Sequence, residues 1–263
     1  DNLTNRSTPE AAKTSMELMT SISSKPARQK DTEKFIKKDA VLEQWYVYYL
    51  QEELFEKEED VRPLFESQLE LCGVEYFDFF LMHAMSATRH ELYKGLRAYE
   101  NCLELKAEGK VRHVGISFHA GPELLEEILT DYPELEFVQI QLNYLDFNDA
   151  AVQSKKCLEV CEKYGKAVMV MEPVKGGALV NLHERAANAL KKYGDCSEAA
   201  YAMRFALSFP ENVLVLSGMG DMNMINDNVN TFKNAVPFTE EEIDGFAEVR
   251  SIIREVKQIP CTK

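Results

Sequence analysis

The sequence predicts an α/β protein whose strands and helices alternate to form a parallel βα barrel of TIM type, with a divergent or incomplete N-terminal part. Five short apolar segments, centred near residues 79, 114, 139, 169 and 215, are separated by stretches with helical periodicity. Strands that alternate serially with helices require a parallel sheet, and strands that are apolar on both faces suit a barrel. No G-x-G-x-x-G motif follows any of these segments, which disfavours a doubly wound dinucleotide-binding sheet.

The composition restricts the function classes. With 263 residues, of which 45% are hydrophobic, the chain can fill a sizeable core. Its 30 Lys and Arg against 44 Asp and Glu give a net charge of −14, which repels nucleic-acid backbones and anionic membrane surfaces. No apolar run reaches the roughly 18 residues of a membrane span, and no signal-peptide pattern opens the chain. Six cysteines form no dense disulfide framework, so we expect a cytoplasmic protein without nucleic-acid or membrane partners.

Two unlike parts follow one another along the chain. Residues 1–65 are polar, carry blocks of charge and are mostly helical in pattern, and WYVYYL (45–50) is their one strand-like window. We expect these residues to form a divergent helical segment and residues 66–263 to form the barrel portion. The chain begins with Asp rather than Met, which suggests a fragment or a processed chain.

The expected elements from residue 66 onward can be placed in order. Strands are expected at 76–83, 111–117, 137–142, 167–172 and 213–218. One helix carries Leu92, Leu96, Tyr99 and Leu103 on one face and ends near Gly109. Further helices begin at Pro122 and cover 152–165, 199–209 and 224–232, and Thr239 with Glu242 forms a capping box for the last helix.

Five motifs in a fixed order carry a family resemblance: EDVRPLFESQLELCGVEYFDFFLMH, EGKVRHVGISFH, FVQIQLNY, MEPVKGGAL and LSGMGDMNMINDNV. Over residues 59–261 this succession resembles the aldo-keto reductases, in particular the bacterial branch with a C-terminal ferredoxin-like iron–sulfur tail. The resemblance implies an oxidoreductase whose barrel binds NAD or NADP at the carboxyl ends of its strands. It also implies hydride transfer between that cofactor and a small-molecule carbonyl or alcohol substrate.

The resemblance implies roles for three polar residues at strand ends. His83 matches the active-site histidine, and an imidazole there donates a hydrogen bond to the substrate oxygen as negative charge develops. Ser117 and Gln139 match the residues that bind the nicotinamide carboxamide, and a side-chain amide offers a donor and an acceptor together. The Asn that commonly follows this serine in the family is Phe118 here. The alternative for each residue is a purely structural hydrogen bond at a strand end.

Five further residues match cofactor-binding positions of the family. Gly176 and Gly177, in the loop after the seventh strand, would let backbone N–H groups approach the pyrophosphate. Met171 stands where relatives place a Tyr under the nicotinamide ring, and a thioether can also cover that ring. Gly218 opens the loop after the last strand, and Asn228 matches the residue that binds adenine. A ligand-free turn and an ordinary surface Asn are the alternatives.

Departures from the family pattern are equally informative. The family's catalytic Asp, Tyr and Lys should all precede residue 66, and no motif there supports an assignment. His83 is therefore the one catalytic residue that we assign. The alternative function is a catalytically inactive barrel that binds a ligand or a protein, and another explanation is that segments of a longer enzyme are missing.

The cysteines argue against a metal centre. The chain ends in QIPCTK, so Cys261 is the one candidate ligand where an iron–sulfur cluster needs four. An iron–sulfur cluster is therefore not expected in this chain. Cys157 and Cys161 lie one helical turn apart among apolar residues, and we expect both to pack in the core rather than bind a metal.

The loop after the last strand bears on the choice of cofactor. Residues 218–224 contain no Lys or Arg, which is the natural partner of the 2′-phosphate of NADP. Asp221 would repel that phosphate, or alternatively caps the following helix. The sequence therefore favours NAD over NADP.

Overall fold

The computed structural model describes residues 19–20, 44–45, 47–50, 57–234 and 236–256. These residues divide into two compact units. Unit 1 holds 19–20, 44–45, 47–50, 57–139 and 159–167, whereas unit 2 holds 140–158, 168–234 and 236–256. The helices expected within 1–18 and 21–43 lie outside the described residues.

Unit 1 is organised around four neighbouring strands, β3 (Val47–Leu50), β4 (Phe77–Met85), β5 (Val111–Phe118) and β6 (Phe137–Gln141), in that order. The pairs β3–β4, β4–β5 and β5–β6 are all parallel. A separate antiparallel pair joins β1 (Met19–Thr20) to β2 (Gln44–Trp45). The strand-like window at 45–50 is therefore strand wherever the structure describes it.

The remaining strands belong to unit 2, into which β6 continues. Next to the end of β6 lies β7 (Ala167–Met171), and β8 (Asn212–Val215) pairs with β7 in parallel. All five strands expected after residue 66 are thus present. The last strand is shorter than expected because residues 216–218 already belong to the following loop.

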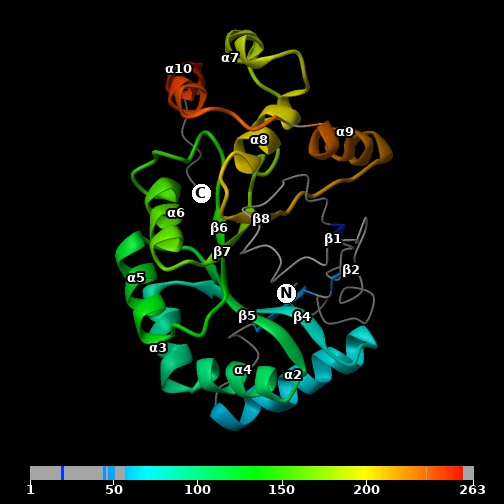
Figure 1. Ribbon diagram of the computed structural model, residues 1–263, viewed down its shortest axis with the longest axis vertical. Coiled ribbons are helices and arrows are strands. Elements are labelled where there is room, and N and C mark those ends of the chain that lie inside the picture. Colours follow the sequence, from blue (N-terminus) through cyan, green and yellow to red (C-terminus); the bar gives the residue numbers. More distant parts are fainter. Residues whose placement is uncertain (1–18, 21–43, 46, 51–56, 235, 257–263) are drawn as a thin grey trace, which may run out of the picture. The chain divides into compact units, whose positions relative to one another are not determined.

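Helices alternate with the strands, as Figure 1 shows for α2 to α5 beside β4 and β5. Unit 1 contains α2 (Glu58–Cys72), α3 (Ala87–Gly95), α4 (Ala98–Ala107) and α5 (Pro122–Asp131), and α6 (Ser154–Lys163) spans the boundary between the units. Unit 2 contains α7 (Glu184–Leu190), the 3₁₀ turn η3 (Lys191–Tyr193), α8 (Glu198–Leu207), α9 (Met222–Asn234) and α10 (Glu240–Val256). The predicted capping box of α10 is confirmed, since the Glu242 carboxylate accepts from Thr239 N and the Thr239 hydroxyl accepts from Glu242 N.

The single helix expected across residues 92–106 is wrong. The structure has two helices, α3 and α4, because Arg97 adopts a left-handed conformation with φ of 50° and interrupts the α-helical hydrogen bonds. The break rotates the second helix, so Leu92 is exposed whereas Tyr99 is fully buried. The leucine spacing that suggested one continuous face is therefore divided between two helices.

Aromatic side chains fill the core of unit 1. Phe65 of α2 meets Phe77 and Phe80 of β4 edge-to-face, with ring centroids 5.7 and 5.0 Å apart. On the same strand, Phe79 contacts Phe137 of β6 edge-to-face at 5.3 Å. All five rings are buried, and each such ring removes a large apolar area from water. This cluster anchors α2 and β6 to the central strand β4.

Unit 2 has its own aromatic core. Tyr193 of η3 stacks on Phe246 of α10 with ring centroids 4.5 Å apart, and Phe205 of α8 meets Phe246 edge-to-face at 5.3 Å. Tyr144, in the loop after β6, also contacts Phe246 at 5.1 Å. The buried Arg250 guanidinium donates one hydrogen bond to the Tyr144 carbonyl at 3.2 Å and so ties α10 to the loop after β6.

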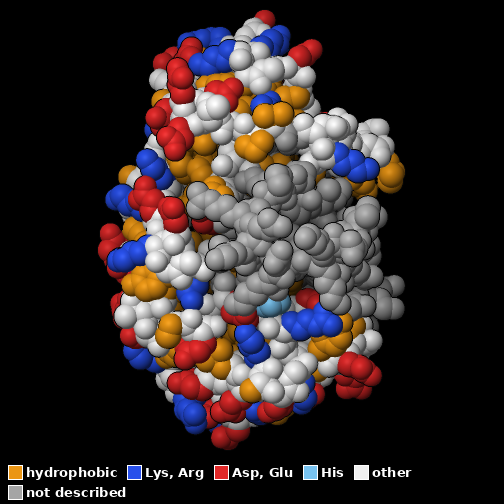
Figure 2. Space-filling view, in the orientation of Figure 1, with side chains coloured by type: hydrophobic (Ala, Val, Ile, Leu, Met, Phe, Trp, Pro, Cys, Tyr) orange, Lys and Arg blue, Asp and Glu red, His pale blue; other side chains and the backbone are white. Residues whose placement is uncertain are grey.

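The surface is charged but mixed in sign. Figure 2 shows acidic and basic side chains interspersed over the face that it presents. Ion pairs such as Arg62 with Glu104 and Glu108, both at 2.8 Å, account for part of this mixture. Exposed pairs of this kind contribute little to stability. Among the described residues no helix is long and apolar enough to cross a membrane.

The absence of a side chain at Gly115 of β5 generates a stability prediction. A Cβ atom at this position would lie 2.5 Å from the Phe137 carbonyl oxygen and 2.7 Å from the Phe137 ring. Because the obstacle includes backbone of the paired strand, Gly115→Ala should lower the free energy of unfolding by about 1–3 kcal/mol. Urea unfolding followed by circular dichroism measures this change.

Gly95→Ala is the matched control for that substitution. Gly95 ends α3, and a Cβ there meets nothing within 4 Å among the described atoms. Alanine is the better helix former, so this variant should be as stable as the unchanged protein or slightly more stable. Equal stability of the two alanine variants would contradict the close packing of β5 against Phe137.

Candidate functional site

Three of the predicted site residues lie on neighbouring strands in unit 1, two of them near the carboxyl ends. His83 is near the end of β4, Ser117 near the end of β5, and Gln139 in β6. Ser117 and Gln139 are register partners, and the Gln139 side-chain amide donates to Ser117 Oγ at 3.3 Å. Their exposed fractions are 1% and 5%. The structure therefore brings two of the three into a buried polar pair.

His83 lies where the register between β4 and β5 changes. Met82 pairs with Ile116 and Met85 with Phe118, so β4 has one more residue than β5 over this interval. Ala84 takes up the extra residue in a left-handed conformation with φ of 50°. Such a bulge redirects the neighbouring side chains, and strained backbone of this kind is common at functional sites.

Helix α3 supplies hydrogen bonds that hold this bulge. The Tyr93 hydroxyl donates to the His83 carbonyl at 3.1 Å, and Arg89 Nη1 donates to the Ala84 carbonyl at 3.2 Å. From the residue that follows β5, the backbone N–H of His119 donates to the Met85 carbonyl of β4 at 2.9 Å. The backbone around His83 is therefore fixed by side chains of a helix and by the end of β5.

His119 is a site residue that the sequence prediction missed. Its Nε2 lies 3.2 Å from Ser117 Oγ, so the Ser117 hydroxyl has two polar neighbours, His119 and Gln139. Desolvation by burial, followed by smaller electrostatic contributions from His83 and Arg89, lowers the pKa of His119 and so favours its neutral imidazole at neutral pH. The alternation of side chains along a strand, which places positions 117 and 119 on the same side, was the available signal.

The loop after β7, in unit 2, contains the next predicted residues. Met171 is half-buried at the end of β7. Gly176 and Gly177 have φ of 58° and 87°, the left-handed conformation that favours glycine. In the described part of the chain, the backbone N–H of Gly177 donates to the Val174 carbonyl, whereas that of Gly176 has no hydrogen-bond partner. This turn therefore leaves a backbone donor available to an anion.

An ion pair between Lys175 of this loop and the buried Asp146 was also missed. Lys175 Nζ lies 2.6 and 2.7 Å from the two carboxylate oxygens of Asp146, whose side chain is 5% exposed. Gln141 and Asn143 donate to the same carboxylate at 2.6 and 2.9 Å. Asn143 also donates to the Glu172 carbonyl at 3.0 Å. The network ties the loop after β6 to the loop after β7 within unit 2.

The segment after β8 contains the last predicted residues. Gly218 is exposed, whereas Asn228 of α9 is buried and donates to Ser217 Oγ at 2.9 Å. Asp221 Oδ1 accepts from the backbone N–H groups of Asn223 and Met224 at 2.8 and 2.9 Å. Asp221 is therefore the N-terminal cap of α9, the structural alternative considered for it.

The two cysteines of α6 behave as core side chains. Cys157 and Cys161 are 3% and 0% exposed. Cys261, with the rest of 257–263, lies outside the described residues.

Comparison with known proteins identifies relatives of the chain. The model of the aldo/keto reductase family matches residues 55–251. An uncharacterized oxidoreductase from Schizosaccharomyces pombe is 28% identical over 167 residues, which cover 64% of this chain and 55% of that protein. The chain thus spans about half the length of the curated relative that it matches.

Solved aldo-keto reductases share the fold. The holo form of one from Bacillus halodurans has a TM-score of 0.62 and 18% identity, covering 77% of this chain and 71% of its own. Another from Klebsiella pneumoniae, in complex with NADP and acetate, has a TM-score of 0.60 and 18% identity, covering 80% and 70%. These likenesses confirm the predicted α/β fold of parallel βα-barrel type.

The Asp146 network generates a second stability prediction. Lys175→Met keeps the length of the side chain but leaves the buried Asp146 carboxylate with amide donors alone, so it should cost about 1–3 kcal/mol of unfolding free energy. Lys163→Met is the control, because Lys163 pairs with Glu126 on the exposed surface and its loss should change stability little. Urea midpoints of both variants test this. A Lys175 variant no less stable than the Lys163 variant would rule out a structural role for this ion pair.

Proposed function

The chain belongs to the aldo/keto reductase family, and on this premise we propose that it transfers a hydride between a nicotinamide dinucleotide and a carbonyl or alcohol substrate. The observation that carries the proposal is the buried Ser117–Gln139 pair beside the end of β4, where His83 lies. The hydrogen bond between the two side chains and their burial fix their orientation, so a small polar ligand that reaches them meets a prearranged hydroxyl and amide. We further propose that the protein acts in the cytoplasm.

Ser117 and Gln139 are suited to the carboxamide of a nicotinamide ring. A carboxamide offers one acceptor oxygen and two donor hydrogens, and a hydroxyl with a side-chain amide offers the complementary set. His119, at 3.2 Å from Ser117 Oγ, orients that hydroxyl. When bound, the dinucleotide supplies or accepts the hydride, whereas these residues hold the ring in one orientation.

His83 is the proposed catalytic residue. An imidazole that donates a hydrogen bond to the carbonyl oxygen stabilises the negative charge that develops on this atom as the hydride arrives. The hydrogen bonds from Tyr93 and Arg89 to the carbonyls of His83 and Ala84 hold the backbone from which the imidazole extends. A backbone held in this way reduces the reorganisation that the reaction requires.

The predicted residues of unit 2 are suited to the rest of the dinucleotide. The backbone N–H of Gly176 and the left-handed turn at Gly176 and Gly177 suit a pyrophosphate oxygen. We also propose that Met171 contacts the nicotinamide ring and that Gly218 and Asn228 contact the adenosine part. Substituents larger than hydrogen at the two loop glycines would be strained by their positive φ.

His83→Ala tests the catalytic assignment. The variant should reduce carbonyls about 10²-fold more slowly, a typical contribution of a general acid, while binding the dinucleotide as tightly as before. His183→Ala is the control, since this exposed histidine caps α7 and should leave turnover unchanged. Steady-state rates on a panel of aldehydes and ketones, with fluorescence titration of the cofactor, provide the measurement. Cofactor binding without turnover of any panel member would instead indicate a ligand-binding module.

The second test concerns the choice of dinucleotide. The Klebsiella pneumoniae relative is in complex with NADP, so family membership alone does not determine whether this chain prefers NAD or NADP. Residues 218–224 carry no cation, and we therefore expect tighter binding of NADH than of NADPH.

Met222→Arg should reverse or reduce this preference, because Met222 is the exposed first residue of α9 and a guanidinium there can pair with a 2′-phosphate. Met222→Gln is the uncharged control. Fluorescence titrations of the unchanged protein and the two variants with NADH and NADPH measure this change in cofactor preference. Tenfold tighter binding of NADPH by the unchanged protein would refute the preference.

A further inference from the structure

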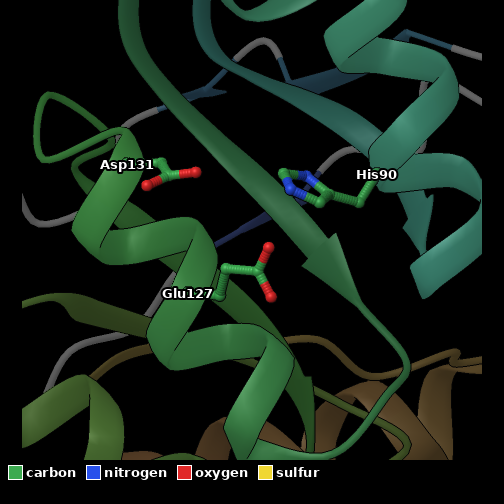
Figure 3. A group of neighbouring side chains, drawn as sticks. All are labelled: His90, Glu127 and Asp131. Carbon is green, nitrogen blue, oxygen red and sulfur yellow. The ribbon is translucent and has the colours of Figure 1, made fainter.

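Three potential metal ligands meet on the outer side of unit 1, away from the residues discussed so far. His90 extends from α3, and Glu127 and Asp131 extend toward it from α5, as Figure 3 shows. One ligand atom from each residue lies within 4.8 Å of the other two. Acidic side chains on helix surfaces often gather without a ligand, so the histidine decides whether this cluster has a function.

His90 is buried with one ring nitrogen unused. Its exposed fraction is 1%, and its Nε2 has no hydrogen-bond partner among the residues that the structure describes. A buried polar atom without a partner destabilises the folded protein relative to a paired one. Buried side-chain nitrogens are generally paired, and the lone pair of this one is available to a further group such as a metal ion.

Tyr99 determines which proton the imidazole carries. Its hydroxyl oxygen lies 2.8 Å from His90 Nδ1, and the hydroxyl itself donates to the sulfur of Met85 at 3.4 Å. With the Tyr99 proton directed to sulfur, Nδ1–H donates to the phenol oxygen and Nε2 keeps its lone pair. A histidine held by its second nitrogen is the usual form of a metal ligand.

The two carboxylates are placed to complete the coordination. Glu127 and Asp131 are four residues apart on α5 and therefore project from one face of the helix. Both are exposed, so their side chains can close the remaining gap to the about 3.4 Å that separates ligand atoms around a tetrahedral ion. One oxygen of Asp131 is 3.4 Å from Lys94 Nζ, an exposed pair that a divalent cation can displace.

We propose that His90, Glu127 and Asp131 bind a divalent transition-metal ion, such as Zn²⁺, that links α3 to α5. One imidazole nitrogen, two carboxylate oxygens and a water molecule form a familiar four-coordinate ligand set, and the two carboxylates neutralise the charge of the ion. The ion stabilises α3, the helix whose Tyr93 and Arg89 bind the backbone at His83 and Ala84. This site does not depend on the proposed oxidoreductase function.

Titration of the whole chain with Zn²⁺ alone, followed by calorimetry, tests the proposal. We expect Glu127→Gln and Asp131→Asn each to weaken zinc binding at least about tenfold, and the double variant to bind one equivalent fewer. Glu134→Gln, which removes one exposed carboxylate outside the cluster, should bind zinc as the unchanged protein does. Because the cysteines are identical in all these proteins, the differences report the cluster and not thiol binding.

Three further measurements separate a metal site from a purely structural cluster. Co²⁺ should give visible absorption bands without thiolate charge transfer, and these bands should be lost in the double variant. Tyr99→Phe should weaken zinc binding about 10–100-fold by removing the group that orients the imidazole. Zinc should also raise the melting temperature of the unchanged protein but not that of the double variant. Equal zinc affinity and stoichiometry in the unchanged protein and the double variant would overturn the proposal, as would the absence of any zinc binding.

Discussion

The contact between Gly115 and Phe137 is the constraint on which the candidate site of unit 1 depends. A glycine in β5 lets the Phe137 ring and carbonyl lie closer than any side chain would permit. This contact fixes the register of the two strands, in which Gly115 opposes Phe137. Two residues further along, the same register places Ser117 opposite Gln139. A shift of one residue would turn these side chains to opposite faces of the sheet, so the polar pair exists because the apolar contact does.

Helix α3 connects this site with the proposed metal cluster. Ser86 caps the helix by accepting from Arg89 N, and the helix then presents three functional side chains within two turns. Arg89 and Tyr93 bind the backbone of the bulge at the end of β4, whereas His90 projects toward α5. A short helix gains little stability from its own hydrogen bonds and depends on such tertiary contacts. An ion at His90 would therefore add a tertiary contact that stabilises this helix.

The order of motifs in the sequence predicted some of the candidate site residues but not all of them. His83, Ser117 and Gln139 stand on neighbouring strands inside recognisable motifs, and two of them form a buried pair. Their roles in hydride transfer remain predictions. His119 ends one of these motifs, but its importance depends on its distance from Ser117 and on a pKa that burial and then neighbouring charges lower. Neither property can be derived from the order of residues in the chain.

The sequence by itself determined the five strands after residue 66 and their alternation with helices, the start of α5 at Pro122 and the cap of α10. Each of these depends on apolar periodicity or on side chains within one turn, and such information is local. Only the tertiary structure decided the break at Arg97, where a left-handed residue divides an apparently continuous apolar face. It alone also paired Asp146 with Lys175 and brought His90 to α5, although these partners lie 29 or more residues apart in the chain. Contacts of this kind arise when separate elements pack together, and a one-dimensional pattern contains no distance between elements.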